Sequence, residues 1–85
     1  MNDFPVRTAA QLPGLLQSFR KSRGLTQVDV AARLGVTQQT LSALERRADN
    51  IGAARLMKLL AILGVELVLR EPDGPLIARD SDVQW

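Results

Sequence analysis

The sequence predicts a mainly α-helical domain of four to five short helices, followed by one β-strand near its C-terminus. Two observations predict the helices: apolar residues recur at intervals of three and four, and each such stretch ends at a glycine or a polar turn. Regular alternation over residues 65–70 predicts the strand. We therefore expect a folded domain at residues 8–71, between a flexible arm at 1–7 and an acidic, disordered tail at 72–85.

The first helix is expected to run from Thr8 to about Ser22. Thr8 and Gln11 have the spacing of a capping box. The apolar residues that follow form one helical stripe: Leu12, Leu15, Leu16 and Phe19. Pro13 removes a backbone donor, so either the helix starts near Leu12 or its first turn is distorted.

Residues 26–47 have the pattern of two short helices joined by a tight turn. Thr26 and Thr37 are good N-caps, and Asp29 completes a box-like cap on the first of these helices. Gly35 suits the left-handed conformation that ends a helix. The apolar residues at helical spacing are Val28, Ala31 and Ala32 in the first helix, and Leu41 and Leu44 in the second. A short turn with a glycine between two helices predicts a helix-turn-helix.

The second helix of this motif begins with two glutamines. Gln38 and Gln39 carry amides that both donate and accept, as a bidentate pair with adenine requires. Recognition helices present their N-terminal residues to base edges in DNA, although most surface glutamines are simply solvated. Gln27 begins the preceding helix and is placed to donate to a phosphate. We interpret the motif as a DNA reader.

A further helix is expected from about residue 52 or 53 to Leu63, ended by Gly64. One stripe should close the core over the earlier helices: Ala53, Leu56, Met57, Leu60 and Leu63. Leu59 and Ile62 lie beside that stripe and widen the apolar surface. They belong either to a generous core or to a subunit interface, and we favour the interface.

A lone strand at residues 65–70 would leave its backbone N–H and C=O groups unpaired. Either the same strand of a two-fold mate pairs with it antiparallel, or residues 76–79 fold back in a hairpin through the turn at 72–74. We prefer a homodimer, to which the hairpin could add. Its predicted contact residues are Leu59, Ile62, Val65, Leu67 and Leu69.

The composition removes most of the tools of an enzyme, because the chain has no cysteine and no histidine. We expect no catalytic residue, no metal site and no cofactor. No apolar run reaches the roughly 18 residues of a membrane span, and no signal pattern begins the chain, so we expect no membrane partner and a cytoplasmic location. At 85 residues the chain buries only about 60% of its unfolded surface, which favours oligomerisation.

The charges divide the chain into a basic body and an acidic end. Residues 1–70 hold ten Lys or Arg against five Asp or Glu (+5), and residues 71–85 hold one Arg against four acids (−3). A charge of +5 alone is an ordinary surface, but arginines flank the proposed groove-facing helix. The predicted phosphate contacts are Arg23, Gln27, Arg33, Thr40, Arg46 and Arg47.

The motif resembles the Xre-type helix-turn-helix family, which includes the lambdoid phage repressors. The run Thr37-Gln38-Gln39-Thr40-Leu41 looks like the start of a recognition helix of that family. The resemblance implies base contacts through Gln38 and Gln39, a phosphate contact through Gln27, and a salt bridge from Arg20 to Glu45.

Residues 8–71 and the terminal Trp85 further resemble one branch, the HipB-like antitoxins. In that branch the base-facing positions match Thr37, Gln38, Gln39 and Ser42. A basic residue can stand at the position of Thr37 in relatives, so the operator sequence does not carry over. The resemblance implies an antitoxin and autorepressor that binds a palindromic double-stranded operator and a HipA-like Ser/Thr kinase toxin, with Trp85 as an anchor on the kinase. The alternative is a stand-alone Xre-type repressor.

Overall fold

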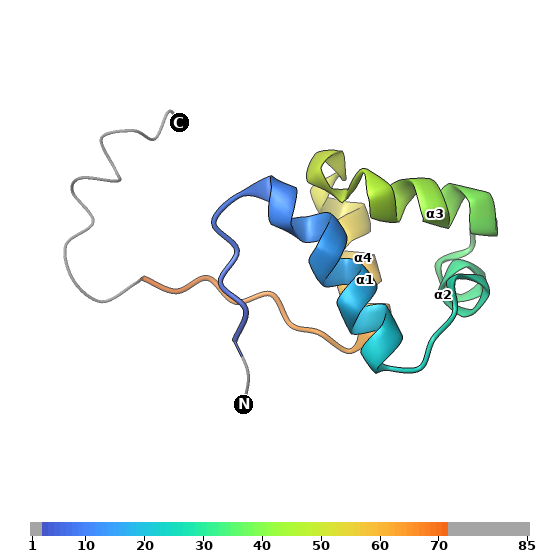
Figure 1. Ribbon diagram of the computed structural model, residues 1–85, viewed down its shortest axis with the longest axis horizontal. Coiled ribbons are helices and arrows are strands. Elements are labelled where there is room, and N and C mark those ends of the chain that lie inside the picture. The colour runs from blue at the N-terminus through green and yellow to red at the C-terminus, as the bar shows by residue number, and fades with distance from the viewer. Residues whose placement is uncertain (1–2, 72–85) are drawn as a thin grey trace.

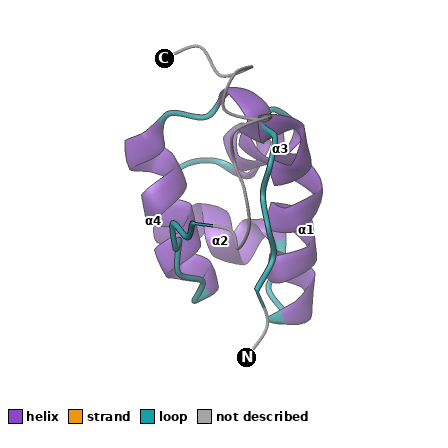
Figure 2. Ribbon diagram, turned by 90° about the vertical axis from the view of Figure 1, so that its left-hand side faces the viewer, coloured by secondary structure: helices purple, strands orange, loops and turns teal. Residues whose placement is uncertain are grey.

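The fold is built from short helices, and a computed structural model describes residues 3–71 of it. Within these residues the α-helices are α1 (Leu12–Ser22), α2 (Gln27–Leu34), α3 (Gln38–Arg46) and α4 (Ala53–Leu63), and single 3-10 turns lie at Ala9–Gln11 and Ala48–Asn50. Figure 1 shows α3 lying across the top of the molecule, and Figure 2 shows α1 and α4 on opposite sides of it with α2 between them. The predicted mainly helical fold is confirmed. None of the helices described is long and apolar enough to cross a membrane.

One apolar core joins the four helices. Leu16 of α1, Val30 of α2, Leu41 of α3 and Leu59 of α4 are each at most 2% exposed. Burying such a side chain fully stabilises the fold by about 1.5–3 kcal/mol. Because every helix contributes to the same core, the inner side of α3 is fixed by packing, and its outer side is left to solvent.

Two of the predicted apolar stripes are rotated from their expected positions. In α2 the core contains Val30, whereas Val28 is 56% exposed. In α4 the core contains Leu59, whereas Met57 is 50% exposed. Both helices are so rich in apolar residues that more than one stripe satisfies the helical spacing, and packing selects between them. The prediction that Leu59 belongs to a dimer interface is therefore wrong, because its own chain covers it.

The start of α1 follows one of the two alternatives that Pro13 left open. The α-helix begins at Leu12, and a 3-10 turn precedes it. The Gln11 side chain accepts hydrogen bonds from the backbone N–H of Arg7 (2.7 Å) and of Thr8 (3.0 Å), which supplies half of the predicted capping box. A proline in the first turn costs no intrahelical hydrogen bond, so the helix tolerates it there.

From residue 3 onward, the predicted flexible arm lies against the rest of the fold. Asp3 forms an ion pair with Arg70 (2.8 Å), and the ring of Phe4 meets that of Phe19 edge-on, with ring centroids 5.1 Å apart. The Gln11 amide also donates to the carbonyl of Pro5 (3.1 Å). These contacts hold the arm beside α1 and beside residues 65–70.

Residues 65–71 leave α4 without forming a strand, and no strand occurs in the described range 3–71. The N–H of Val65 donates to Leu60 (2.9 Å), and within that range no backbone hydrogen bond follows it. Residues 3–71 contain no other strand for this segment to pair with, so the predicted strand needs a partner outside that range or in another chain. The predicted hairpin at 72–79, the acidic tail and Trp85 lie outside the described residues.

Candidate nucleic-acid interface

The N-terminus of α3 presents the two predicted base-reading glutamines. Thr37 caps the helix: its hydroxyl oxygen accepts from the Thr40 N–H (3.1 Å), and its O–H donates to the Thr40 hydroxyl oxygen (3.0 Å). Gln38 and Gln39 occupy the first two positions of the helix and are exposed. Because Leu41 is fully buried beneath them, the turn that carries both amides is fixed to the core.

The turn between α2 and α3 has the geometry that its sequence predicts. Gly35 has a φ of 83°, in the left-handed region that favours glycine. The N–H groups of Gly35 and Val36 both donate to the carbonyl of Ala31 (2.9 and 3.0 Å), and Val36 packs half-buried on the core. The predicted helix-turn-helix is therefore present, and the turn holds α2 and α3 at a fixed angle.

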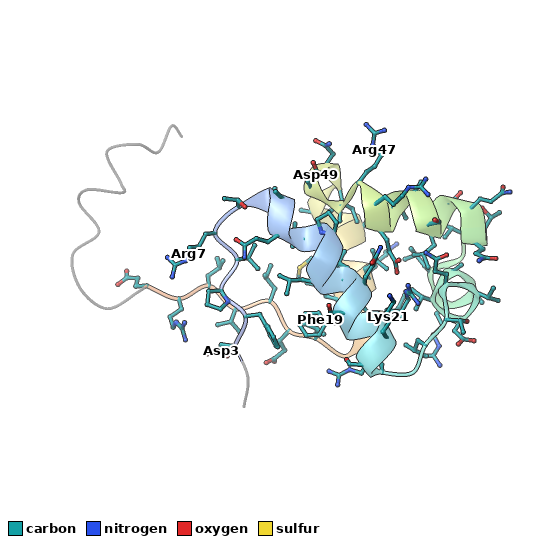
Figure 3. The ribbon with its side chains drawn as sticks, in the orientation of Figure 1. Asp3, Arg7, Phe19, Lys21, Arg47 and Asp49 are labelled. Atoms are coloured by element: carbon teal, nitrogen blue, oxygen red, sulfur yellow. The ribbon has the colours of Figure 1, made fainter. Side chains whose placement is uncertain are left out.

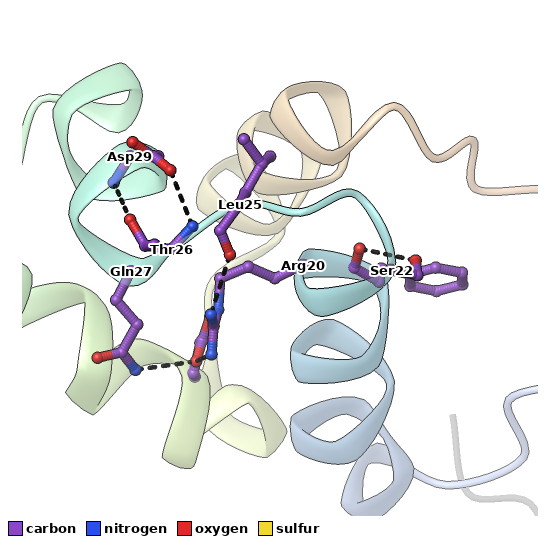
Figure 4. A network of polar contacts seen from close by, with 8 residues as sticks. Arg20, Ser22, Leu25, Thr26, Gln27 and Asp29 are labelled. Atoms are coloured by element: carbon purple, nitrogen blue, oxygen red, sulfur yellow. Dashed lines mark hydrogen bonds and ion pairs between the residues drawn. The ribbon is translucent and has the colours of Figure 1, made fainter.

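A buried ion pair joins α1 to α3. Nε of Arg20 donates to Oε2 of Glu45 (2.6 Å), and Nη2 donates to Oε1 (3.3 Å), so the contact is bidentate. Glu45 is 3% exposed and Arg20 is 9% exposed. Nη1 of the arginine also donates to the carbonyl of Leu25 (3.1 Å), in the loop before α2 (Figure 4). The salt bridge implied by the family resemblance is confirmed.

The same carboxylate holds Gln27, the predicted phosphate contact of α2. Nε2 of Gln27 donates one hydrogen to Oε1 of Glu45 (3.1 Å), as Figure 4 shows. An amide nitrogen carries two hydrogens, so the second remains for another acceptor. Gln27 is half-buried at the first position of α2. Its orientation is thus set by α1 and α3 together.

Two of the predicted phosphate-contacting arginines lie at the C-terminal end of α3. Arg46 and Arg47 are both exposed, and Figure 3 shows Arg47 pointing away from the body of the molecule. Nη1 of Arg46 donates to the hydroxyl of Ser42 one turn earlier (3.2 Å). Both arginines can neutralise phosphates, and Arg46 also orients a predicted base-contacting side chain.

Two other predicted phosphate contacts lie elsewhere. Arg23 donates to the carbonyls of Leu63 (2.8 Å) and Gly64 (3.3 Å), so its guanidinium caps the C-terminus of α4. That end of α4 lies at the bottom of Figure 1, opposite α3. Arg33 lines a shallow hollow between α2 and α4 together with Lys58. The structure does not bring these two arginines together with the start of α3.

Apart from Leu59, which is buried in the core, the predicted dimer residues lie at two separate places on the surface. Ile62 borders the hollow that contains Arg33. The other three, Val65, Leu67 and Leu69, line a separate groove between the arm, α1 and α4. The apolar floor and walls of this groove include Phe4, Leu15, Phe19 and Leu56. The arm thus lines the same groove as residues 65–70. The sequence signal for this packing was the alternation of the apolar residues Phe4 and Val6 in the arm.

Asp29 caps α2 reciprocally with Thr26. The Thr26 hydroxyl accepts from the Asp29 N–H (3.1 Å), and the Asp29 carboxylate accepts from the Thr26 N–H (2.9 Å). These hydrogen bonds from the backbone and side chain of Thr26 lower the pKa of the Asp29 carboxyl from its ordinary value of 3.8, and Arg33 adds a smaller effect.

The stability that Asp29 contributes is therefore expected to depend on pH. Because the pKa is lower in the folded chain than in the unfolded chain, the contribution is complete above the unfolded pKa of about 3.8 and is lost as pH falls through the folded pKa. We expect Asp29→Asn to destabilise the protein at neutral pH and to differ less from wild type at about pH 2. Urea unfolding at both pH values measures this, and an equal difference at the two would contradict it.

The chain resembles known helix-turn-helix proteins over most of its length. A family model described as helix-turn-helix matches residues 16–69. Antitoxin HipB of Escherichia coli O6:H1 is 27% identical over 82 residues, covering 94% of this chain and 87% of that protein. An uncharacterised helix-turn-helix-type transcriptional regulator of Sinorhizobium fredii is 43% identical over 64 residues, covering 72% of this chain and 83% of that protein.

Solved structures give the same likeness in three dimensions. A HipB–O1–O2 complex superposes with a TM-score of 0.72 at 26% identity, covering 81% of this chain and 100% of the HipB chain. A HipB–O4 20mer complex superposes with a TM-score of 0.71 at 26% identity, covering 81% and 97%. The similarity therefore includes the whole helical unit rather than the two-helix motif alone.

Proposed function

The chain belongs to the Xre-type helix-turn-helix family, as a DNA-binding regulator related to the HipB antitoxin, and from this premise we propose that it is an antitoxin. In this proposal it represses its own operon as a homodimer on a palindromic operator. It also binds and neutralises a HipA-like Ser/Thr kinase toxin. The observation that carries the DNA-binding part is the exposed, rigidly seated start of α3, with Gln38 and Gln39 at its first two positions.

The mechanism of recognition divides the polar residues by role. The α3 helices of two protomers enter successive major grooves about 34–36 Å apart. Gln38 and Gln39 read base edges, and Thr37 and Ser42 flank them. Gln27, Thr40, Arg46 and Arg47 hold the register through phosphates. The dimer forms through residues 65–70, whose unpaired backbone and uncovered Leu67 and Leu69 suit pairing with a second copy.

The relatives support this proposal from two directions. The HipB structures that the chain matches are complexes with O1–O2 and with an O4 20mer, and the first relative described above carries the name antitoxin. Alignment with that antitoxin covers 94% of the chain, so the likeness is not confined to the recognition helix. The proposed kinase-binding segment is separate in sequence from the DNA-reading helix: the last fifteen residues carry four of the nine acids of the chain.

The kinase part of the proposal predicts a separable effect of Trp85. A tryptophan that fills a pocket on a partner is commonly a dominant contributor to binding. The proposal requires a HipA-like kinase encoded beside this gene; we expect Trp85→Ala to weaken binding to that kinase by about tenfold or more, and to leave operator affinity unchanged. Calorimetry with the kinase and gel-shift titration of the operator measure the two affinities on the same protein preparation.

The matched control is Val83→Ala, which removes an apolar side chain from the same acidic segment and is expected to change neither affinity by more than about twofold. Equal kinase affinity in the wild type and Trp85→Ala would remove the anchor. If no kinase is encoded nearby and no kinase is bound, the antitoxin proposal itself fails while DNA binding stands.

The second candidate function is a stand-alone transcriptional repressor without a toxin partner. The relative from Sinorhizobium fredii favours it, because that protein is more similar in sequence, at 43% identity, and is described only as a transcriptional regulator. Both candidates use the same α3 surface and the same dimer. The neighbouring open reading frame distinguishes them: a kinase supports the antitoxin, and its absence supports the repressor.

A further inference from the structure

The segment after α4 has two chemically different faces. In an extended chain, successive side chains alternate, so Val65, Leu67 and Leu69 share one face while Glu66, Val68 and Arg70 share the other. The first face begins against the core, where Val65 packs half-buried, and then becomes uncovered, with Leu67 52% and Leu69 92% exposed. Val68, at the middle of the second face, is 69% exposed.

Two-fold symmetry restricts how two such segments can pair. The two-fold axis of a symmetric antiparallel pair is perpendicular to the sheet, so it keeps each face of a strand on the same side. Because directly opposed side chains project to the same side, each residue opposes a residue of its own face. The axis therefore passes midway between two copies of one residue, and the register is defined by which residue that is.

Charge then selects which residue lies on the axis. An axis at Glu66 would oppose two like charges, and an axis at Leu67 would place Glu66 opposite Val68 of the partner subunit. An axis at Leu69 would place Arg70 opposite Val68 and Glu71 opposite Leu67 of the partner subunit. Only an axis at Val68 matches five consecutive positions, with Glu66 opposite Arg70 and Leu67 opposite Leu69; its first mismatch, Val65 opposite Glu71, falls at the ends of the pair.

We propose that the dimer axis passes midway between the two copies of Val68, so that Glu66 of each protomer forms an ion pair with Arg70 of the partner subunit. This inference rests on the homodimer proposed above and specifies its register. On the other face of the two strands, Leu67 of each protomer then lies opposite Leu69 of the partner subunit. The matched pairing covers residues 66–70 and gives the unpaired backbone of both segments its hydrogen-bond partners.

The charges in the single chain are compatible with this exchange. Arg70 pairs with Asp3, but both side chains are more than 60% exposed, so water and salt screen the pair and Arg70 can leave it. Glu66 has no ion pair within the described residues 3–71. The register therefore provides a partner for Glu66 and replaces a weak partner of Arg70.

Charge reversal tests the proposed pairs. Glu66→Arg and Arg70→Glu each place like charges opposite one another at two symmetric positions, and each is expected to raise the dimer dissociation constant about tenfold. The double variant Glu66→Arg/Arg70→Glu restores opposite charges and should return to within about threefold of wild type. Asp3→Asn is the control: it removes the partner that Arg70 has in the single chain, so the dimer should be unchanged or slightly tighter. Sedimentation equilibrium measures all four; failure of the double variant to recover would overturn the ion pairs.

Cysteine cross-linking tests the axis independently of charge. The chain contains no cysteine, so Val68→Cys carries a single thiol, which directly opposes its symmetric copy on the axis. Mild oxidation should link Val68→Cys to itself. Leu67→Cys and Leu69→Cys should link mainly when mixed, because the same residue in two chains is then a diagonal neighbour, roughly 7–8 Å away.

The outcomes separate the register from the dimer. Strongest self-linking at Leu67→Cys would move the axis and overturn the register while the dimer stands. A dimer in which none of the three cysteine variants links would overturn pairing through this segment. A wild-type chain that sediments as a monomer at micromolar concentration would instead refute the proposed dimer itself.

Discussion

Replacing Glu45 by alanine is expected to lower the free energy of unfolding by about 3–5 kcal/mol. The substitution leaves Arg20, whose side chain is only 11% exposed, without its charged partner in a mostly dry site. It also removes the acceptor that holds Gln27. A typical small domain is stable by only about 5–15 kcal/mol, so a loss of this size is a large part of the total. Urea unfolding followed by circular dichroism, at one fixed protein concentration, measures it.

Two further variants separate the charge from the packing. Arg20→Met/Glu45→Met replaces both partners with apolar side chains of similar length, and it should cost far less than Glu45→Ala because no charge is left buried. Glu45→Gln keeps an oxygen acceptor for the amide of Gln27 but loses the charge, and should fall between them. If Glu45→Ala cost less than about 1 kcal/mol, the pair would not be what holds α3 to α1.

Local signals in the sequence were sufficient for the ends of the helices. Threonine at an N-cap and glycine in the left-handed position act within three or four residues, so Thr26, Thr37, Gly35 and Gly64 could be assigned from their neighbours alone, and the structure confirms each. The exposed positions of Gln38 and Gln39 follow in the same way, because the N-cap fixes where α3 begins and Leu41 fixes which side faces inward.

Contacts between distant parts of the chain could not be predicted from spacing. The helical period allows several apolar stripes in α4, and only packing against the other helices selects Leu59 over Met57. Arg23 looked like a phosphate contact because it precedes the motif, but it lies 40 residues from the carbonyl that it caps. The salt bridge between Arg20 and Glu45 could be expected only from the family resemblance. Nothing in the sequence indicated that Gln27 also donates to that carboxylate.

Removing both amides by Gln38→Ala/Gln39→Ala is expected to abolish most of the sequence preference of the protein while leaving its general attraction to DNA. A good bidentate contact between an amide and a base discriminates against the wrong base by about 1–3 kcal/mol, so each single substitution should relax choice at one base pair by roughly 5- to 150-fold. The double variant should approach the sum if the two glutamines read separate base pairs. Both residues are exposed and neither is the N-cap, so the fold should survive.

The phosphate contacts should behave in the opposite way, and this contrast makes the experiment decisive. Arg47→Ala should weaken binding to all sequences alike and reduce the slope of log affinity against log salt by about one. Arg23→Ala removes an equal charge from the C-terminus of α4 and should leave the slope nearly unchanged, because its guanidinium is bonded within the fold. Selection from a random DNA library, followed by titration at several salt concentrations, measures preference and slope together. Unchanged preference in Gln38→Ala/Gln39→Ala would mean that α3 does not read bases through these amides, whatever Arg47 contributes.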